Sequence, residues 1–164
     1  MALGKIFIIL GALLSILGTY IFAIYGVTGS VGSGIGFITN LGTLFGNAAS
    51  IAAGLGIEVI VFYLFVIIFL IFLAAGILQF IGLKSKVAGL IFSLFPLGVG
   101  IMLILTFYTD ILGLKAFFFT IVFIGEQYGN IFPILVDLGG VGLGVYLILG
   151  GGVLGFIGSI MPRD

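Results

Sequence analysis

Four long apolar runs divide the chain. They cover residues 6–27, 59–83, 87–108 and 138–160, and each supplies about the 20 apolar residues with which an α-helix crosses a hydrocarbon core. The second run contains VIVFYLFVIIFLIFLAAGIL, whose β-branched and aromatic residues are also typical of strands. Its length favours a helix, because transmembrane strands need only about ten residues and alternate polar with apolar positions. The pattern predicts four membrane-spanning helices in a single transmembrane domain, residues 1–164.

The first outer segment, residues 28–57, carries no charge until Glu58 follows it and is too long for an ordinary loop. Its first part is rich in Gly, Ser and Thr and is predicted to be extended or irregular. Residues 42–56 place polar and apolar side chains at helical spacing and predict a short helix. We expect this helix to pack on the bundle in the outer interface. The alternatives are an extension of the next span, a re-entrant pore or binding segment, or a complete fifth span.

The second outer segment, residues 109–137, contains the apolar stretch ILGLKAFFFTIVFIG at 111–125. About 15 residues interrupted by Lys115 are too few for a span, so a helix lying on the outer leaflet is predicted. The predicted fold is therefore an all-α integral membrane protein, a four-helix transmembrane bundle with an additional short helix in each outer segment.

Composition supports a membrane location. Of the 164 residues, 63% are hydrophobic and only 6% are charged, whereas a soluble domain carries about a quarter of its residues as charged side chains. The lipid bilayer is accordingly the expected environment. The five basic and five acidic residues provide no basic surface for nucleic acid, so no nucleic-acid partner is expected.

The few charges predict an orientation. Short loops rich in Lys and Arg tend to stay in the cytoplasm, and a four-span arrangement puts Lys5, Lys84, Lys86 and Arg163 on one side. Both termini are therefore expected to be cytoplasmic. The outer side receives Glu58, Asp110, Glu126 and Asp137, with Lys115 as the one exception to the rule. The apolar run after Lys5 is too long for a signal peptide and no A-x-A site follows it, so we expect a retained span.

Small residues predict where helices pack closely. Wound at 100° per residue, the last span places one row of glycines on a single face: Gly140, Gly144, Gly151, Gly155 and Gly158. The first span carries a weaker row of Gly11, Ser15 and Gly18. Since interior glycines weaken a helix unless another backbone lies against them, we expect the last span to pack tightly on the first span or on a neighbouring subunit.

Two other features of the spans have structural interpretations. Pro96 in the third span predicts a kink, which more often shapes a bundle than serves gating. Gly150, Gly152 and Gly155 spell GxGxxG, a dinucleotide-binding fingerprint in soluble βαβ units. Here the motif lies inside a membrane span, so we interpret these glycines as packing residues.

The chain offers little catalytic chemistry. It contains no His and no Cys, which excludes the usual zinc, iron–sulfur and thiol sites, and no cofactor or metal site is expected. Glu58, at the start of the second span, and Asp137 are the carboxylates considered for a polar functional role. Asn130 and Pro133 predict a helix start near Phe132, which would put Asp137 inside a helix. Because residues 138–160 are long enough to span alone, Asp137 is expected in the interface, near Lys115 or the outer loops.

These observations favour a non-enzymatic four-span protein, acting as a structural, scaffold or accessory subunit, with other membrane subunits or a second copy of itself as partner. The alternative is a small oligomeric channel or facilitator lined by residues 28–57 and the kinked third span. The four-span plan with a large first outer segment resembles that of claudin-type and tetraspanin-type proteins in topology alone. Those families mark their outer loops with Trp and Cys, which this chain lacks, so no residue role is carried over.

Overall fold

The computed structural model describes residues 1–162, so Arg163, used above to predict orientation, lies outside the described residues. Four helices are long and apolar enough to cross a membrane. They are α1 (Leu3–Ile16) with the π-helical turn η1 (Leu17–Ile21), α4 (Val59–Leu78) with the 3-10 helix η2 (Gln79–Leu83), α5 (Lys86–Tyr108) and α7 (Leu143–Ile160). The prediction of four helices suited to spanning is confirmed.

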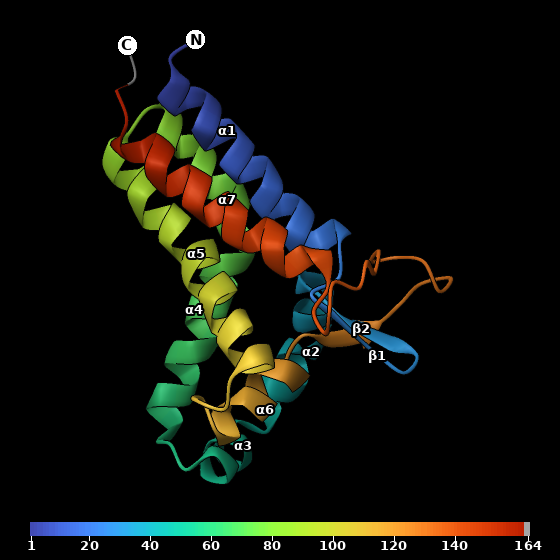
Figure 1. Ribbon diagram of the computed structural model, residues 1–164. Coiled ribbons are helices and arrows are strands. Elements are labelled where there is room, and N and C mark those ends of the chain that lie inside the picture. The colour runs from blue at the N-terminus through green and yellow to red at the C-terminus, as the bar shows by residue number, and fades with distance from the viewer. Residues whose placement is uncertain (163–164) are drawn as a thin grey trace.

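The four long helices pack with both chain ends at one end of the bundle (Figure 1). Helix α7 lies between α1 and α5, and α4 contacts both α1 and α5. The turn between η2 and α5 lies at the same end as the termini, with Lys84 in the turn and Lys86 as the first residue of α5. The three described basic residues of the predicted cytoplasmic side, these two and Lys5, therefore share one end of the bundle.

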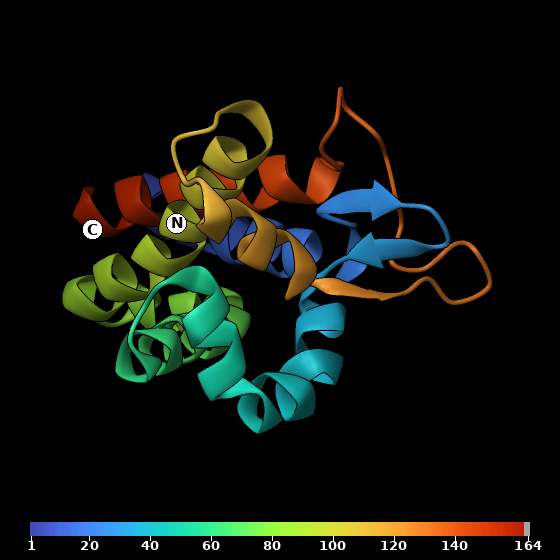
Figure 2. The same cartoon turned by 90° about the horizontal axis from the view of Figure 1, so that it is seen from below.

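The two outer segments fold together at the other end (Figures 1 and 2). The first forms helices α2 (Gly34–Gly46) and α3 (Ala48–Leu55), which are bent by 93° relative to each other. The second forms helix α6 (Leu114–Ile121). To one side of these helices, strands β1 (Tyr25–Val27), β2 (Ser30–Gly32) and β3 (Ile124–Glu126) form an antiparallel sheet in that order. The prediction of a short helix in each outer segment was incomplete, because the first segment has two helices and both segments contribute strands.

The small sheet explains why the first span is shorter than predicted. Helix formation stops at Ile21 rather than residue 27, because Tyr25–Val27 pair with Ser30–Gly32 across a two-residue loop. Gly29 in that loop has φ of +77°, a conformation that favours glycine. The all-α prediction was therefore wrong for these residues. The signal was a Thr-Gly pair between short β-forming stretches, which is typical of a hairpin.

Helix α2 also begins earlier than the predicted helix at 42–56. The Ser33 hydroxyl accepts a hydrogen bond from Gly36 N at 3.1 Å and caps the first turn. Asn47 separates α2 from α3, and Gly56, with φ of +67°, ends α3. The result is a bent helix pair rather than one short helix.

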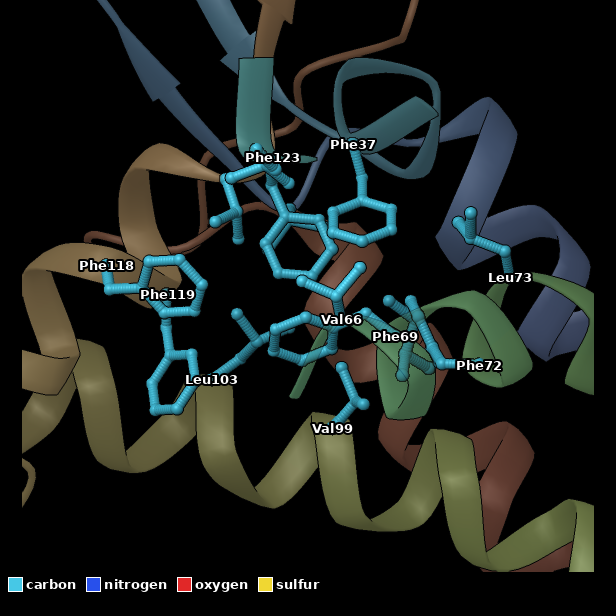
Figure 3. Close-up of a cluster of buried hydrophobic side chains, with 14 of the residues drawn as sticks. Phe37, Val66, Phe69, Phe72, Leu73, Val99, Leu103, Phe118, Phe119 and Phe123 are labelled. Carbon is cyan, nitrogen blue, oxygen red and sulfur yellow. The ribbon is translucent and has the colours of Figure 1, made fainter. Parts of the chain in front are cut away.

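An aromatic cluster holds the outer segments to the long helices (Figure 3). Phe37 from α2, Phe69 from α4 and Phe123, just before β3, have ring centroids 5.4–5.6 Å apart. Phe118 and Phe119 of α6 extend the cluster toward α4. These rings are buried and mostly meet edge to face, the arrangement that aromatic quadrupoles favour. The outer segments are therefore part of the core and not loops laid over it.

Candidate functional site

Helices α1 and α7 meet along two antiparallel rows of glycines. Gly4 and Gly11 on α1 and Gly18 on η1 are spaced by seven residues, and so are Gly144, Gly151 and Gly158 on α7. A seven-residue spacing returns to the same helix face after two turns. The rows run in opposite directions, so that Gly4 meets Gly158, Gly11 meets Gly151 and Gly18 meets Gly144.

The backbones touch along this interface. A Cβ added to Gly11 would lie 2.5 Å from Gly155 N and 2.7 Å from Gly151 O, and one added to Gly18 would lie 2.6 Å from Gly144 O. Such distances are well inside van der Waals contact, so no larger residue fits without moving a helix. Ser15, the remaining small residue of the α1 row, lies against Gly151. The close packing joins two helices of the same chain.

Gly140 lies outside the helix in which it was predicted to pack. It lies before α7, which begins at Leu143 rather than residue 138, and its φ of +101° belongs to a turn. Gly139 shares this left-handed backbone, with φ of +79°. The two glycines reverse the chain so that Leu138 N donates to Val141 O. Nothing lies within 4 Å of a Cβ added to Gly140, so it makes no helix contact.

The opposite face of α7 uses glycines that the sequence analysis did not place on a packing row. Gly152 lies against the backbone of Leu97 on α5, and Gly100 of α5 lies against Leu149 of α7, with Leu149 Cα 2.9 Å from an added Cβ. Leu97 follows Pro96, so the proline-containing stretch of α5 is the part that approaches α7. The sequence signal for this second contact is the run Gly150-Gly151-Gly152, because neighbouring glycines lie on different faces of a helix.

A polar group is buried where α1, η2, α5 and α7 meet. Gln79 is 1% exposed, and its Nε2 donates to Ser15 Oγ at 3.3 Å. Its Oε1 has no hydrogen-bond partner and faces Gly155. Ser93 and Ser159 are also buried here, but their hydroxyls donate to carbonyls of their own helices. Gln79 is thus the buried polar side chain that links η2 to α1 by a hydrogen bond.

The two candidate carboxylates lie at the surface. Glu58 is exposed at the N-cap of α4, where its side chain makes no capping hydrogen bond. Asp137 is exposed and lies outside α7, so the predicted helix start near Phe132 was wrong. Its Oδ1 accepts a hydrogen bond from Gly140 N at 3.1 Å, which stabilises the turn. Within residues 1–162, no three Asp, Glu, His or Cys side chains come together as a group that could hold a metal ion.

Side chains also tie the two outer segments to each other. Asn40 of α2 donates through Nδ2 to Val122 O at 3.0 Å and to Ile124 O at 2.9 Å. The Tyr25 hydroxyl of β1 donates to Thr120 O of α6. Burial raises the pKa of the Tyr25 phenol above its usual value, so it stays a neutral donor. The geometry of this end is therefore fixed by long-range hydrogen bonds as well as by the aromatic cluster.

An apolar groove of about 760 Å³ lies between α4 and α5 and is bounded at one end by α6. Its lining consists of Phe65, Ile68, Phe69, Ile91, Leu94, Phe95, Gly98, Val99, Met102, Leu112, Lys115 and Phe119. Lys115 is the single charged residue among them. Gly98, two residues after Pro96, has open space where a side chain would be. The groove is larger than a second apolar pocket, of about 270 Å³, between α3 and α6.

Comparisons of this chain with protein-family models, with curated proteins and with solved structures find no match. The geometry of the chain itself is therefore the basis for assigning it a function.

Proposed function

We propose that this chain is a multi-pass integral membrane protein with both termini in the cytoplasm. The observation that carries the proposal is the apolar exterior of the four long helices. Large aliphatic side chains point outward along them, including Leu10, Leu13, Ile60, Leu64, Ile67, Ile91, Ile101, Val153 and Ile157. A soluble domain of this size would place charged residues there, whereas hydrocarbon solvates these side chains without cost. One end of the bundle carries Lys5, Lys84 and Lys86 together with both termini, which supports the proposed cytoplasmic location of that end.

Within the membrane we propose a structural or accessory role without enzymatic activity, in an assembly with other subunits or with further copies of this chain. The glycine rows of α1 and α7 contact each other, so they are not available to a partner. A partner must bind elsewhere on the surface.

One exposed surface is suited to binding such a partner. The loop between β3 and α7, together with β1, exposes a group of large apolar side chains that we call the outer apolar surface: Val27, Tyr128, Ile131, Leu135 and Leu138. This loop runs beside β1, since Ile134 N donates to Ile21 O and Leu135 contacts Gly26. Exposed apolar groups of this kind beyond the ends of spanning helices mark contacts with other proteins. We propose that the assembly contact lies here.

The alternative of a channel has less support within one chain. The segment 28–57 packs its Phe37 into the aromatic cluster between α4 and α6, and its polar residues Thr43, Asn47 and Ser50 are exposed on the surface of the chain. Conduction would then need a pore between several copies of the chain.

The assembly proposal is tested by mass determination after extraction in a mild detergent. We expect the wild-type chain to form a complex of defined stoichiometry. A double substitution, Ile131→Lys with Leu138→Lys, is expected to release the single chain, because a charge in an apolar contact must be desolvated. Ile111→Lys is the matched control, since Ile111 is 76% exposed, against 69% for Ile131, and lies on the turn before α6.

Two results would contradict the proposal. If the wild-type chain is extracted as a single copy without any stoichiometric partner, the accessory role is excluded. Ion flux through vesicles containing the purified chain, above that of protein-free vesicles, favours the channel instead.

A further inference from the structure

The groove between α4 and α5 has a rigid wall. Figure 3 shows Phe69 of α4, Val99 of α5 and Phe119 of α6 directed into the same aromatic cluster. Each of them also lines the groove, so its floor is the outer side of the packed core. The floor of the groove is therefore held in place by the packing of the core.

The groove runs along α5. Its lining on α5 extends from Ile91 to Met102, which is about 16 Å along the helix axis. A hydrocarbon chain can lie along this lining, because every residue that lines the groove on α4 and α5 is apolar.

The chemistry of the lining is asymmetric. Eleven of the twelve lining residues are apolar, and the remaining one is Lys115. The other described basic residues lie at the opposite end of the bundle, which is the predicted cytoplasmic end. Lys115 is therefore a basic residue on the side where few are expected. An apolar path that ends in an ammonium group is complementary to an amphiphile whose hydrocarbon tail is attached to an anionic group.

We infer that this groove binds one membrane phospholipid, with a hydrocarbon chain along Ile91–Met102 and the phosphate at Lys115. The inference rests on the proposed membrane location, because only there is a phospholipid always available. Gly98 is central to it. Since the space beside Gly98 is open, a larger side chain at this position fills the groove without displacing the protein backbone.

Native mass spectrometry of the purified full-length chain in detergent tests the inference. Two probes with identical tails are compared: dioleoyl phosphatidylglycerol, which carries a phosphate, and dioleoylglycerol, which does not. We expect one equivalent of phosphatidylglycerol to bind more tightly than any further equivalents. Dioleoylglycerol is expected to enter the same groove with lower affinity, because it lacks the contact with Lys115.

Substitutions separate the tail contact from the phosphate contact. Gly98→Leu is expected to weaken binding of both probes at least tenfold, while Gly42→Leu, at another helical glycine with open space, leaves both unchanged. Lys115→Gln is expected to weaken phosphatidylglycerol about fivefold, the contribution of one Lys near an anionic surface, and to leave dioleoylglycerol unchanged. Lys84→Gln, at the opposite end of the bundle, is the charge control. If Gly98→Leu does not fold, Leu94→Phe on the same wall and 50% exposed serves as the second blocking variant.

Several outcomes would overturn the inference. Equal phosphatidylglycerol binding by the wild type, the blocking variant and Lys115→Gln shows that lipid does not use the groove. A blocking variant that changes the mass of the protein assembly but not lipid binding shows that a helix of a partner or a second copy occupies it. Failure of the membrane proposal is recognised separately, since a chain released from membranes by alkaline carbonate is not integral, whatever it binds in detergent.

Discussion

Gly11 and Gly42 are both helical glycines, yet we expect opposite effects when each is changed to Ala. Gly11 lies in the α1–α7 interface, and Gly42 lies on α2 with nothing within 4 Å of an added Cβ. A helix gains about 1 kcal/mol when an interior Gly becomes Ala. The sign of each effect therefore depends on what the new methyl group contacts.

The magnitude follows from the interface distances. At Gly11 the methyl group would lie 2.5 Å from Gly155 N and 2.9 Å from Gly155 Cα, against 3.4–4 Å for ordinary contact. The neighbours are backbone atoms, so the helices must separate locally by about 1 Å, a gap that loses up to about half of the dispersion energy of the affected contacts. Overpacking costs about 1–3 kcal/mol, and the upper part of that range, about 2–3 kcal/mol, applies here because backbone atoms cannot rotate away. After the gain in helix propensity, we expect Gly11→Ala to destabilise the chain by about 1–2 kcal/mol.

Thermal unfolding in detergent measures the difference. One kcal/mol shifts Tm by about 2–4 °C in a chain of this size. Gly11→Ala is then expected to lower Tm by about 2–8 °C and Gly42→Ala to raise it by about 2–4 °C. Gly18→Ala repeats the first test two turns further along the helix, where an added Cβ would lie 2.6 Å from Gly144 O. Equal shifts for Gly11→Ala and Gly42→Ala would refute the backbone contact between α1 and α7.

Three further substitutions test other parts of the structure by the same Tm assay. Gln79→Met removes a buried oxygen that has no partner together with one long hydrogen bond, so stability should change by less than about 1 kcal/mol; a larger loss would mean that Oε1 is bonded. Asn40→Ala removes the donor to Val122 O and Ile124 O and should cost about 1–3 kcal/mol, with faster proteolysis of the outer segments; wild-type resistance would contradict these bonds. Gly140→Ala should cost about 1–2 kcal/mol through its positive φ alone, whereas a gain would indicate a helical Gly140.

The long helices could be predicted because membrane-length apolar runs have few other solutions. The ends of two helices could not, since they depend on competing local structure. Residues 22–27 are apolar enough to continue α1, but pairing with Ser30–Gly32 satisfies their backbone in a sheet instead. Residues 138–142 are similarly apolar, yet Gly139 and Gly140 form a turn. Apolar length alone does not distinguish helix from short strand or turn at the end of a span.

The glycine contacts show what helical periodicity can predict and what it cannot. Winding the sequence at 100° per residue found Gly144, Gly151 and Gly158, which lie in the interface with the first span. It also found Gly155, whose backbone touches Gly11 but where an added Cβ would meet Ser93 and Gln79. It also included Gly140, because the helix was assumed to begin too early, and it did not select Gly4, which lies against Gly158. The seven-residue spacing common to both helices identifies the register of the pair. The groove could not be found in this way, because it depends on which faces of α4 and α5 meet and on how α6 folds back on them.

The location of the glycine rows changes how an assembly defect should be interpreted. A bulky substitution at Gly151 separates α1 from α7 in the same chain, so a loss of assembly in that variant follows from unfolding and does not identify a partner surface. A substitution at Ile131, by contrast, changes an exposed side chain that the core does not use. If the assembly proposal is correct, the variant with Ile131→Lys and Leu138→Lys loses its partner and unfolds at the Tm of the dissociated wild-type chain, whereas the Gly151 variant loses Tm and assembly together. Loss of assembly at constant Tm in a Gly151 variant would instead mean that α7 meets a second chain.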